Sequence, residues 1–374
     1  MNQTSEVAIV GAGAAGCAVA YYLAQAGVKA TVIEERGTGS QASGYAAGGL
    51  NPLQGAGIPG PLAPLALESY RMHLELWAKL RDETGIDLQG RIVSLVKVAF
   101  QESELPELQE TLELFNAAVG FQARWLDAQE IAKLEPRVTP DAIRGLYARG
   151  NASVDSYKYT LALAQAAEKL GASFRSGAVR GLARSKGRVT GLRLDGGTVS
   201  CGQVVLAMGP WSRKAEAWLD TYIPVDPLKG EILRVELPGP PLNYELSGGG
   251  ASLYPKPGGL VWCGGTEEWR GFDLEPSESA RQCIARGAAR LMPDMAHSRL
   301  VLQTACLRPV TPDWLPIIGR APGWENVYLA TGAGKKGILI SPGMGKAIAD
   351  LVTRGTTELP INPFSPQRFA GPLD

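Results

Sequence analysis

The stretch that decides the fold of this chain is Val7-Ala-Ile-Val-Gly-Ala-Gly-Ala-Ala-Gly16. Its first four residues form a short apolar run that predicts a buried β-strand, and residues 18–26 predict the helix that follows. Between them, Gly11, Gly13 and Gly16 have the spacing G-x-G-x-x-G. In such a unit the first glycine allows a tight turn, the second lets a pyrophosphate approach the backbone, and the third lets helix and strand pack closely.

A second predicted strand, residues 29–33, leads directly into Glu34, about 20 residues beyond the glycines. A carboxylate at this place accepts hydrogen bonds from a ribose 2′-hydroxyl and repels the 2′-phosphate of NADP. The N-terminus of the helix between the strands offers unpaired N–H groups and a partial positive charge to phosphates. The alternative is a glycine-rich turn that closes the unit without a ligand. The agreement of strand, glycines, helix and acid favours an adenine dinucleotide site.

The length and composition of the chain narrow the classes of protein. Its 374 residues exceed what one hydrophobic core usually supports, so two domains are expected. Lys plus Arg equals Asp plus Glu at 37 each, and a net charge of zero argues against sequence-independent nucleic-acid binding. No apolar run reaches the roughly 18 residues of a membrane span, and no signal-peptide pattern precedes Val7. We therefore expect a cytoplasmic protein without a transmembrane segment.

The usage of cysteine and histidine limits the chemistry. The cysteines are scattered and have no C-x-x-C spacing, which predicts reduced thiols without disulfides. Only two histidines occur, His73 and His297. His73 lies in a helical, partly apolar pattern that is more typical of a packed or exposed side chain than of a catalyst. This scarcity argues against a Ser-His-Asp hydrolase and a His-rich metal site, so we expect no metal and chemistry supplied mostly by a cofactor.

Residues 36–52 form a run of small residues that is too flexible to pack as a core element. The run is either a surface linker or a loop that lies flat against a planar ligand, where larger side chains would collide. An NAD enzyme of simple design would continue here into another strand–helix unit. The absence of that unit favours a flavin whose isoalloxazine ring extends past the pyrophosphate.

The glycine-rich unit, the acidic pair Glu34-Glu35 and the stretch Ala42-Ser-Gly-Tyr-Ala-Ala-Gly-Gly49 together resemble the D-amino-acid oxidase superfamily of flavoproteins. The resemblance is closest to its glycine oxidase and sarcosine oxidase branch, and it extends over nearly the whole chain. Val204-Val-Leu-Ala-Met-Gly-Pro-Trp-Ser212 resembles the family's strand that closes the cofactor domain near the pyrophosphate. Residues 305–319 and 331–338 resemble the two C-terminal signatures, except that alanine stands at 333 where histidine is usual.

The resemblance implies an α/β fold, in which a Rossmann-like FAD domain of the glutathione-reductase type carries an inserted α+β substrate domain built on an antiparallel sheet. It assigns residues 1–80, 145–222 and 306–374 to the FAD domain, and residues 81–144 and 223–305 to the substrate domain. It also implies a set of residues that contact FAD. These are Gly11, Gly13, Ala14, Ala15, Gly16, Glu34, Glu35, Ala42, Ser43, Ala47, Gly48, Gly49, Val179, Gly209, Gly334, Lys335, Lys336, Gly337 and Ile338.

Four residues are implied in the chemistry. Arg308 lies in an apolar Leu-Arg-Pro segment, and a planar guanidinium is suited to hold a carboxylate by two parallel hydrogen bonds. In the family this arginine holds the amino-acid carboxylate above the flavin; the alternative is a structural ion pair. Lys335 and Lys336 are cations that would favour flavin reduction, or else solvated surface lysines. Tyr254 lies on the expected antiparallel sheet, either in its core or in a pocket against the flavin.

Two further features concern the end of the chain. Cys306 precedes Thr311 by five residues, as does the cysteine that carries flavin covalently in the sarcosine oxidase branch. The Leu-Arg-Pro segment matches the glycine oxidase branch better, so we expect non-covalent FAD and keep attachment to Cys306 as the alternative. The last helix is expected to begin near Ser341-Pro342, since serine followed by proline fits a helix N-terminus.

The implied reaction is oxidation of a small amino acid or N-alkyl amino acid, of the glycine, sarcosine or D-amino acid type. Hydride transfer to flavin N5 would give an imine that hydrolyses to an oxo acid, with oxygen or another carrier as electron acceptor. One alternative is an FAD module acting on the carboxymethylaminomethyl group of a tRNA wobble uridine, which the neutral charge disfavours. Another is a non-catalytic FAD subunit of a hetero-oligomeric dehydrogenase. The particular amino acid, its enantiomer, the acceptor and homo-oligomer formation stay open at this point.

Overall fold

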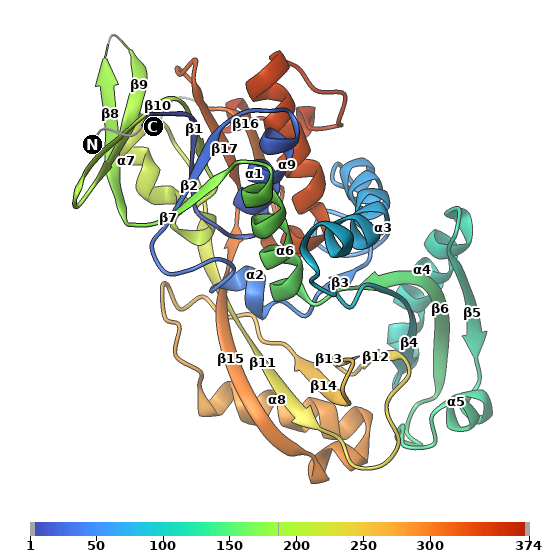
Figure 1. Cartoon of the computed structure of the whole chain (residues 1–374). Helices are drawn as coiled ribbons and strands as arrows, with labels where there is room; N and C mark the ends of the chain where they lie inside the picture. Colours follow the sequence, from blue (N-terminus) through green and yellow to red (C-terminus); the bar gives the residue numbers. More distant parts are fainter. Residues whose placement is uncertain (1–3, 186, 371–374) are drawn as a thin grey trace.

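The computed structural model describes residues 4–185 and 187–370, which fold around two β-sheets (Figure 1). The first sheet is mostly parallel and has the order β16-β17-β10-β1-β2-β7, with a hairpin of β8 and β9 attached to β10. Its strands are β1 (Thr4–Val10), β2 (Ala30–Glu34), β7 (Ser173–Ser176), β8 (Val179–Ser185), β9 (Arg188–Leu194), β10 (Gly197–Leu206), β16 (Ile317–Arg320) and β17 (Val327–Thr331).

The glycine-rich unit lies at the centre of this sheet. Val7 and Ile9 of β1 pack into one hydrophobic core, and Ala8 and Val10 pack into another, so both faces of the strand are buried. A strand buried on both faces needs a continuous apolar run rather than an alternating one, which explains its sequence. The predicted strand–helix–strand order is therefore confirmed in β1, α1 and β2.

Helices cover one face of the first sheet, as Figure 1 shows for α1, α6 and α9. Helix α1 (Ala14–Gln25) lies against α9 (Gly337–Arg354) and α6 (Ser156–Lys169), and α3 (Ala63–Thr84) packs on α9 and α6. A Cβ atom at Gly345 would come within 2.5 Å of the Ala18 side chain, so the glycine permits the close contact of α9 and α1. The prediction that α1 begins at residue 18 is wrong: the helix begins at Ala14, directly after Gly13 as its N-cap.

The prediction that the last helix begins at Ser341-Pro342 is also wrong. Helix α9 begins at Gly337, and Pro342 lies inside it. A proline inside a helix cannot bond the carbonyl four residues earlier, which here belongs to Ile338. That carbonyl accepts hydrogen bonds from the Ser341 hydroxyl at 2.8 Å and from His73 Nε2 at 2.9 Å. The two side chains replace the missing backbone bond, and His73 is a buried packing residue, in line with its sequence pattern.

The second sheet is mostly antiparallel and has the order β15-β11-β14-β13-β12-β4-β6-β3, with β5 paired to β6. Helix α8 (Glu278–Leu291) packs against β11, β13 and β14 and shares a core with the sheet. The strands are β3 (Gly49–Leu50), β4 (Arg91–Ala99), β5 (Gln122–Leu126), β6 (Arg144–Ser153), β11 (Asp226–Glu236), β12 (Glu245–Gly248), β13 (Ala251–Pro255), β14 (Leu260–Gly264) and β15 (Arg299–Val310).

Short elements complete the described chain. They are α2 (Ala42–Tyr45), α4 (Leu105–Ala117), α5 (Ala128–Leu134), α7 (Glu216–Leu219), and the 3₁₀ turns η1 (Glu102–Glu104), η2 (Gly209–Ala215), η3 (Pro293–His297), η4 (Gly334–Lys336), η5 (Asn362–Phe364) and η6 (Pro366–Phe369). In residues 4–185 and 187–370, no helix is long and apolar enough to cross a membrane. The cytoplasmic location stays a prediction.

The two sheets correspond broadly to the two parts expected from the sequence. Three strands depart from the predicted boundaries: β3, β6 from Gly145 onward and the last residues of β15 fall in segments assigned to the FAD domain, yet all three pair in the second sheet. The outer segments 1–80 and 306–374 also extend beyond the described residues at the two termini. The domain division as a whole stays a prediction.

Candidate active site

A cavity of about 880 Å³ is lined by residues from both sheets and from the loops between them. It extends from the glycine-rich unit of the first sheet to the strands β11, β13 and β15 of the second. Most of the residues predicted to contact cofactor or substrate line it. These are Gly11, Gly13, Ala14, Ala15, Glu34, Glu35, Ala42, Ser43, Ala47, Val179, Gly209, Tyr254, Arg308, Gly334, Lys335, Gly337 and Ile338.

The three glycines of the first turn have different surroundings. Gly11 has a φ of +104°, and a Cβ atom there would lie 2.4 Å from the Ala207 carbonyl oxygen. A Cβ atom at Gly16 would lie 1.9 Å from the Gly11 oxygen, so Gly16 is needed for packing and does not line the cavity. At Gly13 the nearest atom to a Cβ is Ser43 Oγ at 3.2 Å, and the residue faces the cavity. The surroundings of Gly11 and Gly16 agree with a tight turn and with close packing, and the approach of a pyrophosphate at Gly13 stays a prediction.

The acidic residue at the end of β2 lies beside this turn. Glu34 accepts hydrogen bonds from the Ala12 and Arg36 backbone N–H groups, each at 2.8 Å. An ionised carboxylate has about four acceptor sites, so Glu34 can still accept from a further hydroxyl. Glu35 also lines the cavity and forms an exposed ion pair with Arg180 at 3.9 Å. Both positions are compatible with a ribose at this end of the cavity.

The small-residue run is a wall of the cavity rather than a surface linker. Ala42, Ser43 and Ala47 line it, and the Ser43 hydroxyl accepts a hydrogen bond from the Ala14 N–H at 2.9 Å. Gly48 and Gly49, in contrast, do not line the cavity. A Cβ atom at Gly48 would lie 2.0 Å from the Val154 oxygen, and Gly49 pairs with Ser153 in the second sheet. Gly48 therefore lets the run pass close to the residue that follows β6.

The part of the cavity on the first sheet fits FAD in its chemistry. The N-terminus of α1 and an acid for a ribose lie at one end, and a smooth wall of small side chains follows. The Ser40 hydroxyl lines the cavity and is buried without a hydrogen-bond partner among the described residues. Buried polar groups are rarely left unpaired, so this hydroxyl is suited to a polar ligand atom.

The wall on the second sheet follows from strand alternation. Thr304, Cys306 and Arg308 of β15 line the cavity at every second position, and Gly230 lies opposite Cys306 on β11. A Cβ atom at Gly230 would lie 2.0 Å from Arg308 Nη1, so the guanidinium occupies the space above this glycine. A glycine inside a strand often marks such a close approach. Sequence reasoning did not assign Gly230, although this signal was present.

The Arg308 guanidinium is held by backbone oxygens. Its Nη1 donates to the Thr266 carbonyl at 3.0 Å and lies 3.5 Å from the Lys229 carbonyl. In residues 4–185 and 187–370, no carboxylate forms an ion pair with Arg308. Tyr254 lines the same cavity, and burial raises the pKa of its phenol, with a smaller effect from Glu245. The phenol is therefore neutral at physiological pH.

The two neighbouring lysines point to different places. Lys335 lines the cavity, where its ammonium forms an ion pair with Glu267 and lies 5.3 Å from the Trp314 ring centroid. The Lys336 ammonium donates instead to the Asn51 carbonyl at 3.0 Å and to the Gln54 carbonyl, and Lys336 does not line the cavity. Burial lowers the pKa of Lys336 to about 8, with a smaller effect from the neighbouring lysine.

The remaining features of the site are the Cys306 thiol, two residues of the loop after β14, and the question of a metal site. Burial raises the pKa of the Cys306 thiol, so the neutral thiol predominates at the cavity wall. Thr266 and Glu267, which sequence reasoning did not single out, reach the site only because the chain folds back after β14. No group of His, Cys, Asp and Glu suited to hold a metal ion occurs in the part of the chain that the structure describes.

Fold and cavity together define a flavoprotein of the FAD-dependent oxidoreductase class. The family model described as DAO, FAD dependent oxidoreductase, matches residues 6–351, and the chain belongs to this family with FAD as its cofactor. It is 33% identical to a glycine oxidase of Geobacillus kaustophilus over 99% of each chain. It is 29% identical to a D-amino acid dehydrogenase of Xanthobacter autotrophicus, covering 97% of this chain and 99% of the relative.

The structural comparison agrees. The crystal structure of glycine oxidase from Geobacillus kaustophilus matches with a TM-score of 0.92 at 32% identity, covering 99% of this chain and 100% of that chain. The predicted family, fold class and cofactor are therefore confirmed.

Proposed function

We propose that this protein oxidises a small amino acid or N-alkyl amino acid to an imine, which water hydrolyses to an oxo acid and ammonia or an amine. FAD, when bound, supplies the hydride acceptor. Relatives named glycine oxidase and D-amino acid dehydrogenase support this substrate class, because both act on amino acids by name. The particular amino acid and the final electron acceptor are part of the proposal.

The observation that supports the proposal is the environment of the Arg308 guanidinium. Its guanidinium lines the cavity, two backbone oxygens hold it in place, and no carboxylate of the described chain neutralises it. A buried or half-buried cation without a counter-ion is costly, and a substrate carboxylate would compensate it by charge-assisted hydrogen bonds. Such a clamp fixes the orientation of a bound amino acid before reaction.

The remaining lining residues support binding rather than proton transfer. The described lining includes no histidine, and the Tyr254 phenol stays protonated and can only donate or accept a hydrogen bond. The substrate amine is therefore expected to react in its neutral form, having lost its proton to solvent. Lys335 and Glu267 neutralise one another at the cavity wall. The positive charge of Arg308 is thus left for the carboxylate of a bound substrate.

Anaerobic reduction of the enzyme-bound flavin tests the proposal. The holoenzyme is mixed with glycine, sarcosine, and D- and L-amino acids, and loss of the oxidised flavin absorbance is followed. We expect reduction by at least one small amino acid and much slower reduction by the corresponding amine without a carboxylate. A protein that binds FAD but is reduced by none of them would contradict the proposed function and favour a non-catalytic FAD subunit.

A further inference from the structure

A loop of residues 265–277 connects β14 to α8 and forms part of the cavity wall. Thr266 of this loop holds Arg308, and Glu267 lines the cavity. Farther along, the Phe272 ring stacks on Trp211 with centroids 6.0 Å apart, and Trp211 also lines the cavity. The loop therefore contributes one hydrogen-bond acceptor to Arg308 and two side chains to the cavity region.

Strand β11 holds the first part of the loop by its backbone. Lys229 exchanges two backbone hydrogen bonds with Glu268, at 2.9 and 3.0 Å. The Glu231 N–H donates to the Thr266 hydroxyl at 3.1 Å. Thr266 is thus fixed on both sides: its hydroxyl bonds β11, and its carbonyl accepts from Arg308.

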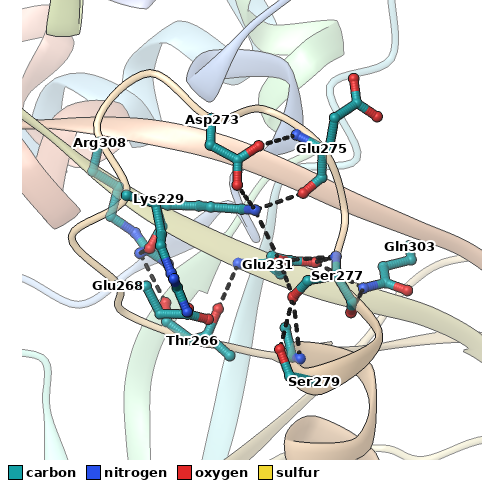
Figure 2. A network of polar contacts seen from close by, with 12 residues as sticks. Lys229, Glu231, Thr266, Glu268, Asp273, Glu275, Ser277, Ser279, Gln303 and Arg308 are labelled. Atoms are coloured by element: carbon teal, nitrogen blue, oxygen red, sulfur yellow. Dashed lines mark hydrogen bonds and ion pairs between the residues drawn. The ribbon is translucent and has the colours of Figure 1, made fainter.

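The side chains of the same two β11 residues hold the last part of the loop, as Figure 2 shows. The Lys229 ammonium donates to Asp273 Oδ2 at 2.7 Å and to the Glu275 carbonyl at 2.5 Å. The Glu231 carboxylate accepts from the Ser277 N–H at 3.0 Å and from its hydroxyl at 2.9 Å. Gln303 of β15 donates to Glu231 at 2.7 Å and ties the network to the strand that carries Arg308.

The pair at the centre of this network is buried. The Lys229 and Glu231 side chains are 2% and 0% exposed, and the ammonium lies 3.4 Å from the carboxylate. Burial alone would lower the pKa of Lys229, but the hydrogen bond to Asp273 and the charge of Glu231 raise it, so the ammonium is retained. Desolvation makes a buried ion pair a weak source of stability compared with apolar side chains of the same volume. We therefore attribute the Lys229–Glu231 pair to fixing the geometry of the loop rather than to stabilising the fold.

Strand alternation places this network directly behind the site. Gly230 faces the cavity beneath Arg308, whereas its neighbours Lys229 and Glu231 do not line the cavity. The Lys229 carbonyl lies 3.5 Å from Arg308 Nη1, while the Lys229 ammonium bonds the far end of the loop. The same residue thus contacts both the guanidinium and the loop that orients it.

We propose that Lys229 and Glu231 are positioning residues: through the 265–277 loop they hold the Arg308 guanidinium in the orientation that binds a substrate carboxylate. This inference rests on the proposed function of Arg308. It assigns no contact with substrate to either residue.

The test compares two variants that each leave a buried carboxylate without its cation. Lys229→Met removes the ammonium from the network. Arg137→Met is the matched control, because Arg137 forms a largely buried ion pair with Glu135 at 2.7 Å, lies outside β11 and the 265–277 loop, and does not line the cavity. For each holoenzyme, two quantities are measured well below its melting temperature. These are the Kd of acetate from flavin absorbance, and the ratio of flavin-reduction efficiencies for sarcosine and dimethylamine.

We expect Lys229→Met to raise the Kd of acetate and to lower the sarcosine-to-dimethylamine ratio, each by about 10- to 100-fold, because a small misplacement of a binding group costs this much. Arg137→Met should leave both within about twofold of wild type, since distant sites act independently. A lower melting temperature in both variants, with no change in the Kd of acetate or in the sarcosine-to-dimethylamine ratio, would overturn the proposal. If Lys229→Met does not retain FAD, the same two quantities are measured in Asp273→Ala, which removes a partner of Lys229 at a position that is 43% exposed. The same changes are expected, and their absence would overturn the proposal.

Wild-type behaviour separates this inference from the proposed function. If wild-type holoenzyme does not prefer sarcosine to dimethylamine and does not bind acetate, the carboxylate clamp itself is wrong. If wild type shows both properties and Lys229→Met shows them equally, only the positioning role is wrong.

Discussion

Replacing Arg308 by alanine is expected to remove the recognition of the substrate carboxylate while leaving FAD in place. Arg308 lines the cavity on β15, whereas the glycine-rich turn and Glu34 lie on the first sheet. In the folded protein the arginine makes one hydrogen bond of normal length, to the Thr266 carbonyl. Losing that bond costs about 1 kcal/mol of folding stability, so the melting temperature should fall by only a few degrees.

The effect on turnover is expected to be much larger. A bidentate guanidinium makes two hydrogen bonds to a carboxylate, each worth about 1.5–3 kcal/mol because both partners are charged. Their loss corresponds to about 3–6 kcal/mol, or roughly two to four orders of magnitude in kcat/KM. Arg308→Lys should recover only part of this, because an ammonium cannot make the parallel two-bond contact.

The assay is stopped-flow reduction of the flavin by sarcosine and by dimethylamine, in wild type and in both variants. Arg308→Ala should lose rate with the amino acid and change little with the amine. If all three proteins prefer the amino acid to the same degree, Arg308 is not the carboxylate clamp. Lys335, another cation that lines the cavity, would then be the next candidate.

Further predictions follow from the same geometry. Acid or heat should release FAD from the protein, and Cys306→Ser should keep its full flavin content; flavin that stays with the precipitated wild-type chain would instead indicate attachment at Cys306. Gly11→Ala should lose FAD and stability, because its Cβ would lie 2.4 Å from the Ala207 oxygen, whereas Gly27→Ala, at a φ of +76° with no atom within 4 Å, should keep FAD. Burial lowers the pKa of His73 from 6.5 to about 4. Because the unfolded chain then binds the proton at higher pH than the folded chain, stability should fall as the pH drops from about 6.5 toward 4. In urea unfolding measured across this pH range, the free energy of unfolding should fall less steeply with decreasing pH in His73→Gln than in wild type. Equal pH dependence in the two proteins would refute the lowered pKa of His73.

Much of the cofactor site could be predicted from the sequence, because its requirements are local. A tight turn that closes on Ala207 needs a glycine at position 11, and a strand buried on both faces needs an apolar run. Such constraints act within a few residues and leave a readable pattern. The small-residue run was informative for the same reason, although only part of it lines the cavity: Gly48 is small because the Val154 carbonyl lies close to it, and Gly49 pairs in the second sheet.

The sequence could not predict where long side chains find their partners. Lys335 and Lys336 are neighbours, yet one ammonium pairs with Glu267 at the cavity and the other bonds the Asn51 carbonyl, 285 residues away. Pro342 looked like the start of a helix, because only the fold shows that Ser341 and the distant His73 take up the carbonyl it leaves free.

The sequence by itself determined the first strand–turn–helix unit, the FAD cofactor, the family and the candidate clamp Arg308. The tertiary structure decided what surrounds Arg308: the Thr266 carbonyl on a loop, the glycine beneath the guanidinium, and the buried pair Lys229 and Glu231 on the other side of β11. The physical reason is that backbone constraints depend on neighbours along the chain, whereas a buried charge is stabilised by whichever groups the fold brings within hydrogen-bond distance.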